Sequence, residues 1–135
     1  MTGITERMMA ADRASAHLGI ELVSHSQGHA VTRMMVRDDM VNGHGVLHGG
    51  VLFTLGDTAF AVSCNQVAPP SVAAAAEIVF VAPAREGDEL LATAELRTQF
   101  GRTGIYDVTI RRGDDVVAEF RGRSQQLHSA TGRDG

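Results

Sequence analysis

The sequence of 135 residues has little cysteine, no long uncharged apolar run and no signal-like leader. Its single cysteine, Cys64, rules out an intrachain disulfide, and we expect an intracellular, cytoplasmic protein. Residues 1–13 carry four charged side chains and lack the apolar stretch of a signal peptide. The longest apolar candidate, 46–67, contains Asp57, so no segment matches the ~20 uncharged residues of a membrane helix.

Basic residues are also in the minority, and the pattern of a metal-binding helix is missing. The formal net charge of −4 argues against a nucleic-acid-binding protein, which would present a basic surface. The six histidines do not form an HExxH motif, so we expect neither a metal site nor a resident cofactor. The serines lack the context of a nucleophile elbow, and Cys64 lies late in an apolar segment, where a buried, unreactive thiol is expected.

Hydropathy periodicity predicts an α+β protein. The length suits a single domain, 1–135, with a core at about 15–127 and a polar tail at 128–135. Strands and helices do not alternate, so a doubly wound parallel sheet is not expected, and one antiparallel sheet against one apolar helix is the simplest solution. We expect a helix at 5–18, strands at 20–26 and 29–37, a buried helix at about 51–65 that begins near Gly49, and strands at 71–81, 88–99, 105–111 and 116–127.

Asp57 stands out because it lies inside the helix that is apolar nearly all round. An unpaired carboxylate in such a helix costs free energy or has a raised pKa. Such groups persist where they face a cleft, a partner or a subunit interface, which makes Asp57 a candidate catalytic residue. The alternative is structural: Asp57 could cap a neighbouring loop or pair with an arginine.

Gly49 and Gly50 have no side chains, so they leave the backbone accessible at the start of the same helix. The first N–H groups of a helix have no internal acceptor and, with the helix dipole, favour developing negative charge. A thioester carbonyl could bind there, although Gly-Gly alone can also serve only to turn the chain. Asp57 lies eight residues beyond Gly49, or roughly 12 Å along a helix. The two groups can therefore act on one substrate only if they come from different subunits.

These residues form a recognisable pattern. Asn42 precedes His48-Gly49-Gly50, and Asp57 follows His48 by nine residues. The pattern closely resembles the hotdog-fold acyl-CoA thioesterases of the phenylacetate-degradation (PaaI) type. The resemblance extends over roughly 15–127 through Asp57-Thr58-Ala59-Phe60-Ala61, Cys64-Asn65, the strand end Ile78 to Pro83, Thr103-Gly104-Ile105-Tyr106-Asp107 and Ala118-Glu119-Phe120-Arg121-Gly122-Arg123-Ser124.

The resemblance implies a curved antiparallel sheet wrapped around a long central helix, in homodimers that assemble into homotetramers. The Gly49 N–H would polarise the thioester carbonyl, and Asp57 of the opposite subunit would attack it or activate water. Asn42 would help to hold the carbonyl or the water, and His48 would orient the loop. Gly50 would belong to the substrate site at the start of the helix.

Further residues follow from the same resemblance. Arg102, in the turn 100–104, is our candidate for the coenzyme A phosphates, with Thr103 beside it. Ala73 takes the position of a hydroxyl residue that places the water in some relatives, and Ala61 takes that of a threonine in others.

The expected reaction is hydrolysis of an acyl-CoA, with an aromatic acyl group of the phenylacetyl or hydroxyphenylacetyl kind. Coenzyme A is then part of the substrate, and neither a nucleic acid nor a membrane is an expected partner. A dehydratase is disfavoured by the order of His48 and Asp57. The alternative that stays open is a non-catalytic protein that binds or senses acyl-CoA, because Ala73 and Ala61 leave the site sparse.

Overall fold

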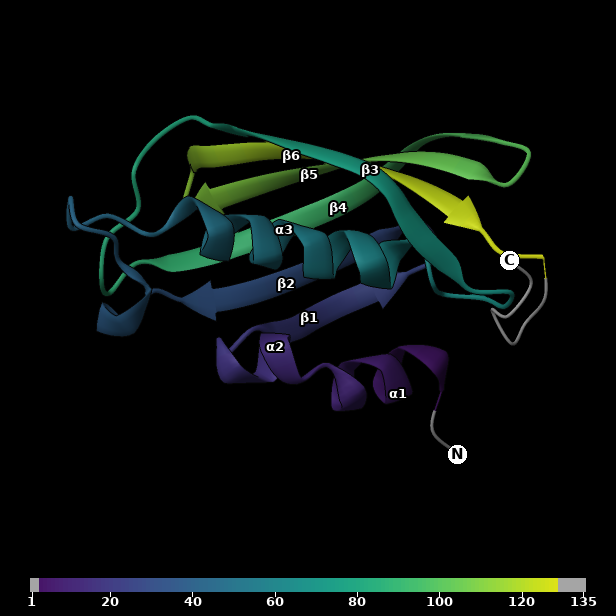
Figure 1. Cartoon of the computed structure of the whole chain (residues 1–135), viewed down its shortest axis with the longest axis horizontal. Helices are drawn as coiled ribbons and strands as arrows, with labels where there is room; N and C mark the ends of the chain where they lie inside the picture. The colour runs from purple at the N-terminus through teal and green to yellow at the C-terminus, as the bar shows by residue number, and fades with distance from the viewer. Residues whose placement is uncertain (1–2, 129–135) are drawn as a thin grey trace.

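The computed structural model describes residues 3–128, and it consists of one curved sheet with a long helix packed across its concave face (Figure 1). The helices are α1 (Ile4–Ala11), α2 (Arg13–His17), the 3₁₀ helix η1 (Asp38–Met40) and α3 (Gly49–Ser63), and the strands are β1 (Glu21–Ser26), β2 (His29–Met35), β3 (Ser71–Phe80), β4 (Glu89–Phe100), β5 (Thr103–Arg112) and β6 (Asp115–Gln126).

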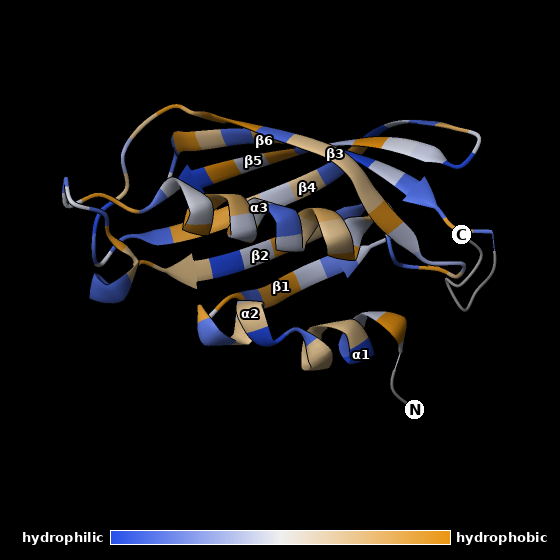
Figure 2. Ribbon diagram, viewed as in Figure 1, coloured by the Kyte–Doolittle hydropathy of each residue, from blue (hydrophilic) through white to orange (hydrophobic). Residues whose placement is uncertain are grey.

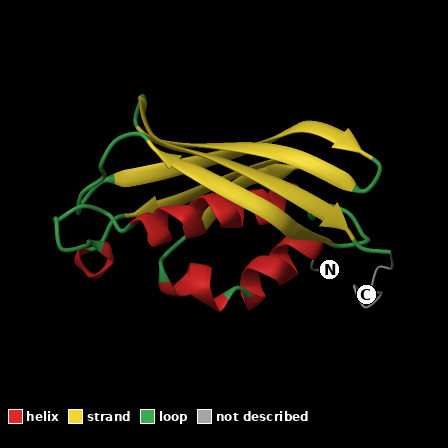
Figure 3. Ribbon diagram, turned by 45° about the horizontal axis from the view of Figure 1, so that its top comes forward, coloured by secondary structure: helices red, strands yellow, loops and turns green. Residues whose placement is uncertain are grey.

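The sheet is antiparallel throughout and has the strand order β1-β2-β4-β5-β6-β3. Strand β3, which follows α3 in the chain, pairs with the last strand and so forms one edge of the sheet. Figure 3 shows the sheet arching over α3. The expected hotdog architecture, an α+β fold with a central helix, is confirmed.

Helix α3 forms the centre of the core because it is apolar on nearly every face. Leu55, Ala59, Phe60 and Val62 are buried there, against the alternate inward-facing residues of the strands. The ring of Phe60 packs edge-on against that of Tyr106, with 5.5 Å between the centroids. A polar side chain on α3 therefore has a fixed position relative to the sheet.

The N-terminal helix expected over 5–18 is in fact two short helices, so that prediction was wrong. Asp12 has an extended backbone (φ −83°, ψ 90°) and breaks the helix. Its side chain accepts a hydrogen bond from the Ser15 N–H at 3.0 Å, which makes it the N-cap of α2. Aspartate favours this position because its carboxylate satisfies an N–H that the helix itself leaves without a partner.

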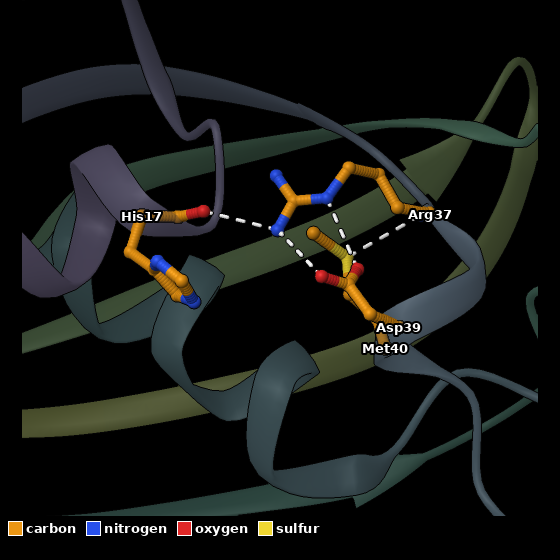
Figure 4. Close-up of polar contacts among 4 residues, drawn as sticks. All are labelled: His17, Arg37, Asp39 and Met40. Atoms are coloured by element: carbon orange, nitrogen blue, oxygen red, sulfur yellow. Dashed lines mark hydrogen bonds and ion pairs between the residues drawn. The ribbon is translucent and has the colours of Figure 1, made fainter.

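Arg37 joins the end of α2 to the loop that leads to α3. Its guanidinium donates to the His17 carbonyl oxygen at 3.0 Å and to the Asp39 carboxylate at 3.1 Å, and its N–H donates to the Met40 sulfur (Figure 4). Arg37 thus attaches the N-terminal helices to the start of the loop that leads to α3. Among residues 3–128 no helix is long and apolar enough to cross a membrane.

Candidate active site

The start of α3 presents one unused backbone donor. His48 is the N-cap of the helix, and its Nδ1 accepts a hydrogen bond from the Gly50 N–H at 3.3 Å. In the described part of the chain nothing accepts the Gly49 N–H. His48 therefore caps the helix, and the Gly49 N–H has no acceptor within the described residues. The Gly50 N–H already donates to His48. A role for Gly50 in substrate binding stays a prediction.

Asn42 organises the loop that precedes α3. Its Oδ1 accepts hydrogen bonds from the backbone N–H groups of His44, at 2.9 Å, and of Val46, at 3.3 Å. The amide oxygen is thereby occupied, so the side-chain group that remains for a ligand is the Nδ2 donor. The expected role of Asn42 in holding a carbonyl oxygen or a water stays a prediction.

A groove of about 370 Å³ connects Asn42 with Gly49. Phe80, at the end of β3, lies over the helix start, and a Cβ atom built at Gly49 would be only 2.9 Å from the Phe80 ring. A side chain at Gly49 would therefore require the Phe80 ring, which is 57% exposed, to shift. The remaining lining is mostly apolar: Val46, Leu47, Leu52, Val81, Ala82, Pro83 and Ala84.

Asp57 lies two turns further along α3 and is half-buried. Within residues 3–128 its carboxylate has neither a hydrogen bond nor an ion pair, so the cap or arginine pair considered from the sequence is absent there. Burial and, to a lesser extent, the negative charge of Asp12 raise the pKa of Asp57. An unpaired carboxylate with a raised pKa is a suitable general base or nucleophile.

The other expected site residues lie at the far end of the sheet. Ala73 pairs with Ser124 near the start of β3, and Thr103 donates a hydrogen bond to Gln125 at 3.1 Å. Arg102 is exposed in the turn between β4 and β5, where it contacts His128. From Ala73 to Phe80 the strand β3 advances by roughly 23 Å. Within one chain, the residues near Arg102 therefore lie far from those near Gly49.

Cys64 is not a nucleophile in this environment. Burial raises the pKa of its thiol to about 12, so the thiolate is not populated at neutral pH. In the described range 3–128, no group of three or more His, Cys, Asp or Glu side chains could hold a metal ion.

Sequence reasoning missed two features of this region. Phe80 had no signal of its own, because its position over Gly49 depends on how β3 ends beside the helix. Asp12 was read as part of a continuous helix, although an aspartate three residues before Ser15 is a recognisable cap signal.

Comparisons with known proteins find relatives of this chain in both sequence and structure. The model of the thioesterase superfamily matches residues 44–119. The acyl-coenzyme A thioesterase PaaI of Escherichia coli K12 is 44% identical over 121 residues, which cover 89% of this chain and 86% of that protein. Human acyl-coenzyme A thioesterase 13 is 31% identical over 107 residues, 76% of each chain. The solved structure of the E. coli PaaI protein from the phenylacetic acid degradation operon superimposes with a TM-score of 0.88 and 43% identity, covering 91% of this chain and 90% of that one.

Proposed function

The chain belongs to the thioesterase superfamily, and we propose that it is an acyl-coenzyme A thioesterase with Asp57 as its catalytic carboxylate. The observation that carries this proposal is the half-buried carboxylate of Asp57, which has a raised pKa and, among the described residues, no partner. The fold places this group on the same helix whose first N–H, that of Gly49, is also unused. These are the two elements that thioester hydrolysis needs: a base or nucleophile, and a donor for the oxyanion.

The reaction would run across a dimer interface. The thioester carbonyl oxygen accepts a hydrogen bond from the Gly49 N–H, with the Asn42 amide as a second donor. Asp57 of the opposite subunit either attacks the carbonyl carbon or removes a proton from a water that attacks it. On the nucleophilic route Asp57 forms a mixed anhydride as the C–S bond breaks, and water then hydrolyses the anhydride and frees Asp57; on the general-base route water attacks the carbonyl carbon directly and the C–S bond breaks afterwards. On both routes water supplies the OH of the free acid and, through Asp57, the proton of the coenzyme A thiol. The reaction uses no cofactor.

The exposed edge of the sheet supports this dimer. Strand β3 has a free edge and is apolar over most of its length (Figure 2), with Val72, Val79 and Phe80 exposed. Antiparallel pairing of β3 with its copy around a twofold axis would place the Ala73 end of one strand beside the Phe80 end of the other. The Arg102 and Thr103 side of one subunit would then approach the Gly49 side of its partner. Two such dimers would form the homotetramer.

We assign an aromatic acyl group, phenylacetyl or hydroxyphenylacetyl, as the preferred substrate. Support comes from the 44% identity to PaaI of E. coli, whose solved structure is described as a protein of the phenylacetic acid degradation operon. Arg102 is the candidate for the phosphates of coenzyme A, because a guanidinium binds phosphate through a fixed fork of donors. Ala73 has no hydroxyl that could place the attacking water. Asp57 would therefore hold the water itself or attack the thioester directly.

Thiol release from a panel of acyl-CoA compounds tests this function. The panel contains phenylacetyl, hydroxyphenylacetyl, benzoyl, and short and medium straight-chain thioesters, and the free thiol is measured with Ellman's reagent. We expect the highest kcat/KM with the aromatic acyl groups. Faster hydrolysis of straight chains would contradict the substrate assignment alone. No release from any thioester, with CoA compounds still raising the melting temperature, would instead identify a protein that only binds acyl-CoA.

A further inference from the structure

A second cavity lies at the C-terminal end of α3, away from the groove at the helix start. It has a volume of about 310 Å³ and is bounded by the end of α3, the β1–β2 turn, the start of β3, and strands β5 and β6 (Figure 1). Its polar lining includes Cys64, Tyr106, Ser124, Gln27, Gln66 and Gln99. Among the residues that the structure describes, no acidic, basic or histidine side chain lines this cavity. The cavity is therefore polar but uncharged.

Tyr106 brings an unused hydroxyl to this cavity. The residue is only 5% exposed, and its ring is held by the edge-on contact with Phe60. Within residues 3–128 its hydroxyl has no hydrogen-bond partner, whereas every side-chain oxygen or nitrogen there that is fully shielded from solvent has one. The Tyr106 oxygen is therefore reached from the cavity that the residue lines. Burial raises the pKa of the phenol, so the hydroxyl is protonated at neutral pH and can both donate and accept.

An accessible stripe along α3 connects Asp57 with this cavity. From Asp57 to the end of the helix, the residues that are not fully buried are Asp57, Ala61 and the C-cap Cys64. Positions four and then three residues apart lie on one face of a helix. Cys64 lines the cavity and lies roughly 10 Å further along the helix axis than Asp57. Ala61 between them has a small side chain, so an acyl group with its carbonyl carbon at Asp57 can extend along this face into the cavity.

We propose that Tyr106 is a specificity-determining residue: the cavity takes the far end of the acyl group, and the Tyr106 hydroxyl forms a hydrogen bond with a neutral hydroxyl carried there. This inference rests on the proposed function. A site that hydrogen-bonds a substrate hydroxyl discriminates against the analogue without it, because a buried polar group is then left without a partner. The uncharged lining also discriminates against an acyl group that ends in a carboxylate, because the described lining residues do not offset its desolvation.

Three ring-substituted substrates and one substitution test the inference. The thioesters are phenylacetyl-CoA, 4-hydroxyphenylacetyl-CoA and 4-carboxyphenylacetyl-CoA, which share the carbonyl and the ring and differ in the group at the far end. Tyr106→Phe removes one oxygen atom and keeps the ring that packs on Phe60. The control variant is Thr93→Val, which removes a hydroxyl from a groove on the outer face of the sheet.

We expect the wild type to hydrolyse the hydroxylated thioester with the highest kcat/KM and the carboxylated one with the lowest. In Tyr106→Phe, kcat/KM for the hydroxylated thioester should fall by roughly tenfold or more, while the value for phenylacetyl-CoA should change by less than about twofold. Thr93→Val should keep the wild-type ratio. An equal fall for both thioesters in Tyr106→Phe would show a structural effect and overturn the proposal.

A second variant tests the route along α3. Cys64→Leu places a larger side chain on the stripe between Asp57 and the cavity, and its melting temperature shows whether the fold is kept. We expect kcat/KM for the phenylacetyl thioesters to fall by roughly tenfold or more, while short straight-chain thioesters, whose acyl groups end beside Asp57, change by less than about twofold. Unchanged hydrolysis of the phenylacetyl thioesters would overturn the placement of the acyl end in this cavity.

Binding separates a failure of this inference from a failure of the proposed function. Calorimetry with non-hydrolysable thioether analogues of phenylacetyl-CoA and 4-hydroxyphenylacetyl-CoA does not require turnover. If the wild type hydrolyses both thioesters equally well and Tyr106→Phe changes neither rate, the role of Tyr106 is overturned and the proposed function stands. If no thioester is hydrolysed while the hydroxylated analogue binds more tightly in the wild type than in Tyr106→Phe, the proposed function fails and the role of Tyr106 stands.

Discussion

Asp57 is an ionisable side chain in a helix that otherwise packs into the core, and its position opposes folding at neutral pH. We predict that Asp57→Asn raises the melting temperature at pH 7 by roughly 2–5 °C, because the amide removes a charge that burial disfavours. Differential scanning calorimetry measures this, with Asp114→Asn in an exposed turn as the control. A lower melting temperature for Asp57→Asn would mean that the carboxylate has a stabilising partner.

The same residue predicts how stability depends on pH. Because the pKa of Asp57 is raised in the folded state, the folded protein holds this proton more tightly than the unfolded chain does. That contribution to stability is complete below the unfolded value of about 3.9 and is lost as the pH rises through the folded pKa. The difference in melting temperature between Asp57→Asn and the wild type should therefore be largest near pH 7 and vanish toward about pH 4. A difference that is constant with pH would contradict this linkage.

His48 has a structural role in our account, which gives a third prediction. His48→Ala should lower the free energy of unfolding by about 1 kcal/mol, because the Gly50 N–H loses its acceptor. His48→Asn, with an oxygen that can cap the helix, should restore most of that loss and keep the wild-type pH profile of kcat/KM. Urea denaturation and steady-state kinetics measure the two effects. Loss of turnover in His48→Asn at full stability would show that the imidazole takes part in the reaction.

At the scale of single residues, the sequence reveals those whose type is rare at their position in an element. Asp57 was recognisable because an acid is rare in an apolar helix, and Gly49 because of its position at the helix start. Phe80 and Asp12 act through contacts between segments distant in sequence: Phe80 over Gly49, and Asp12 through Ser15 to Thr58. Such contacts depend on tertiary packing, which no local pattern encodes.

Among the elements, α3 and the strands it contacts fit with little spare room. A Cβ atom at Gly122 of β6 would lie 2.8 Å from the ring of Phe60, which is only 1% exposed. We predict that Gly122→Ala lowers the free energy of unfolding by about 1–3 kcal/mol. Gly43→Ala is the control, since no atom lies within 4 Å of a Cβ built there. Equal denaturation midpoints for the two variants would contradict close packing at Phe60.

Element boundaries illustrate what periodicity can and cannot predict. The strands β4, β5 and β6 agree with the expected ranges within a few residues, because their inward faces alternate cleanly. The N-terminal helix was predicted as one element because the local change at Asp12 interrupts the backbone for a single residue and leaves the surrounding composition unchanged. The Asp12 carboxylate caps α2 through the Ser15 N–H, and the contact between α2 and α3 is made by the Ser15 and Thr58 hydroxyls.

At the scale of the whole molecule, the proposed reaction requires two subunits for each active site. We predict that specific activity falls when the protein is diluted below the dissociation constant of the dimer, because Gly49 and Asp57 then no longer meet. Light scattering at the same concentrations measures the dimer fraction, and carrier albumin controls for adsorption to surfaces. Activity that stays constant in demonstrably monomeric protein would contradict a shared site.

The overall architecture was the most predictable level. The order of elements and the apolar α3 favoured an antiparallel sheet over a doubly wound parallel one, and the resemblance around Asn42, Gly49 and Asp57 indicated the hotdog fold. The strand order was less accessible, because it depends on β3 crossing to pair with β6 instead of with its sequence neighbour. That crossing determines which strand is exposed, and hence the edge that we assign to the dimer.

The most direct test of the central claim is the turnover number of Asp57→Asn against the wild type, measured with the best acyl-CoA substrate. Because the carboxylate acts on the transition state, we predict that kcat falls by about 10³-fold or more while KM changes little. Circular dichroism and the melting temperature confirm that the variant is folded. A folded Asp57→Asn with near-normal kcat would contradict the assignment of Asp57 as the catalytic residue.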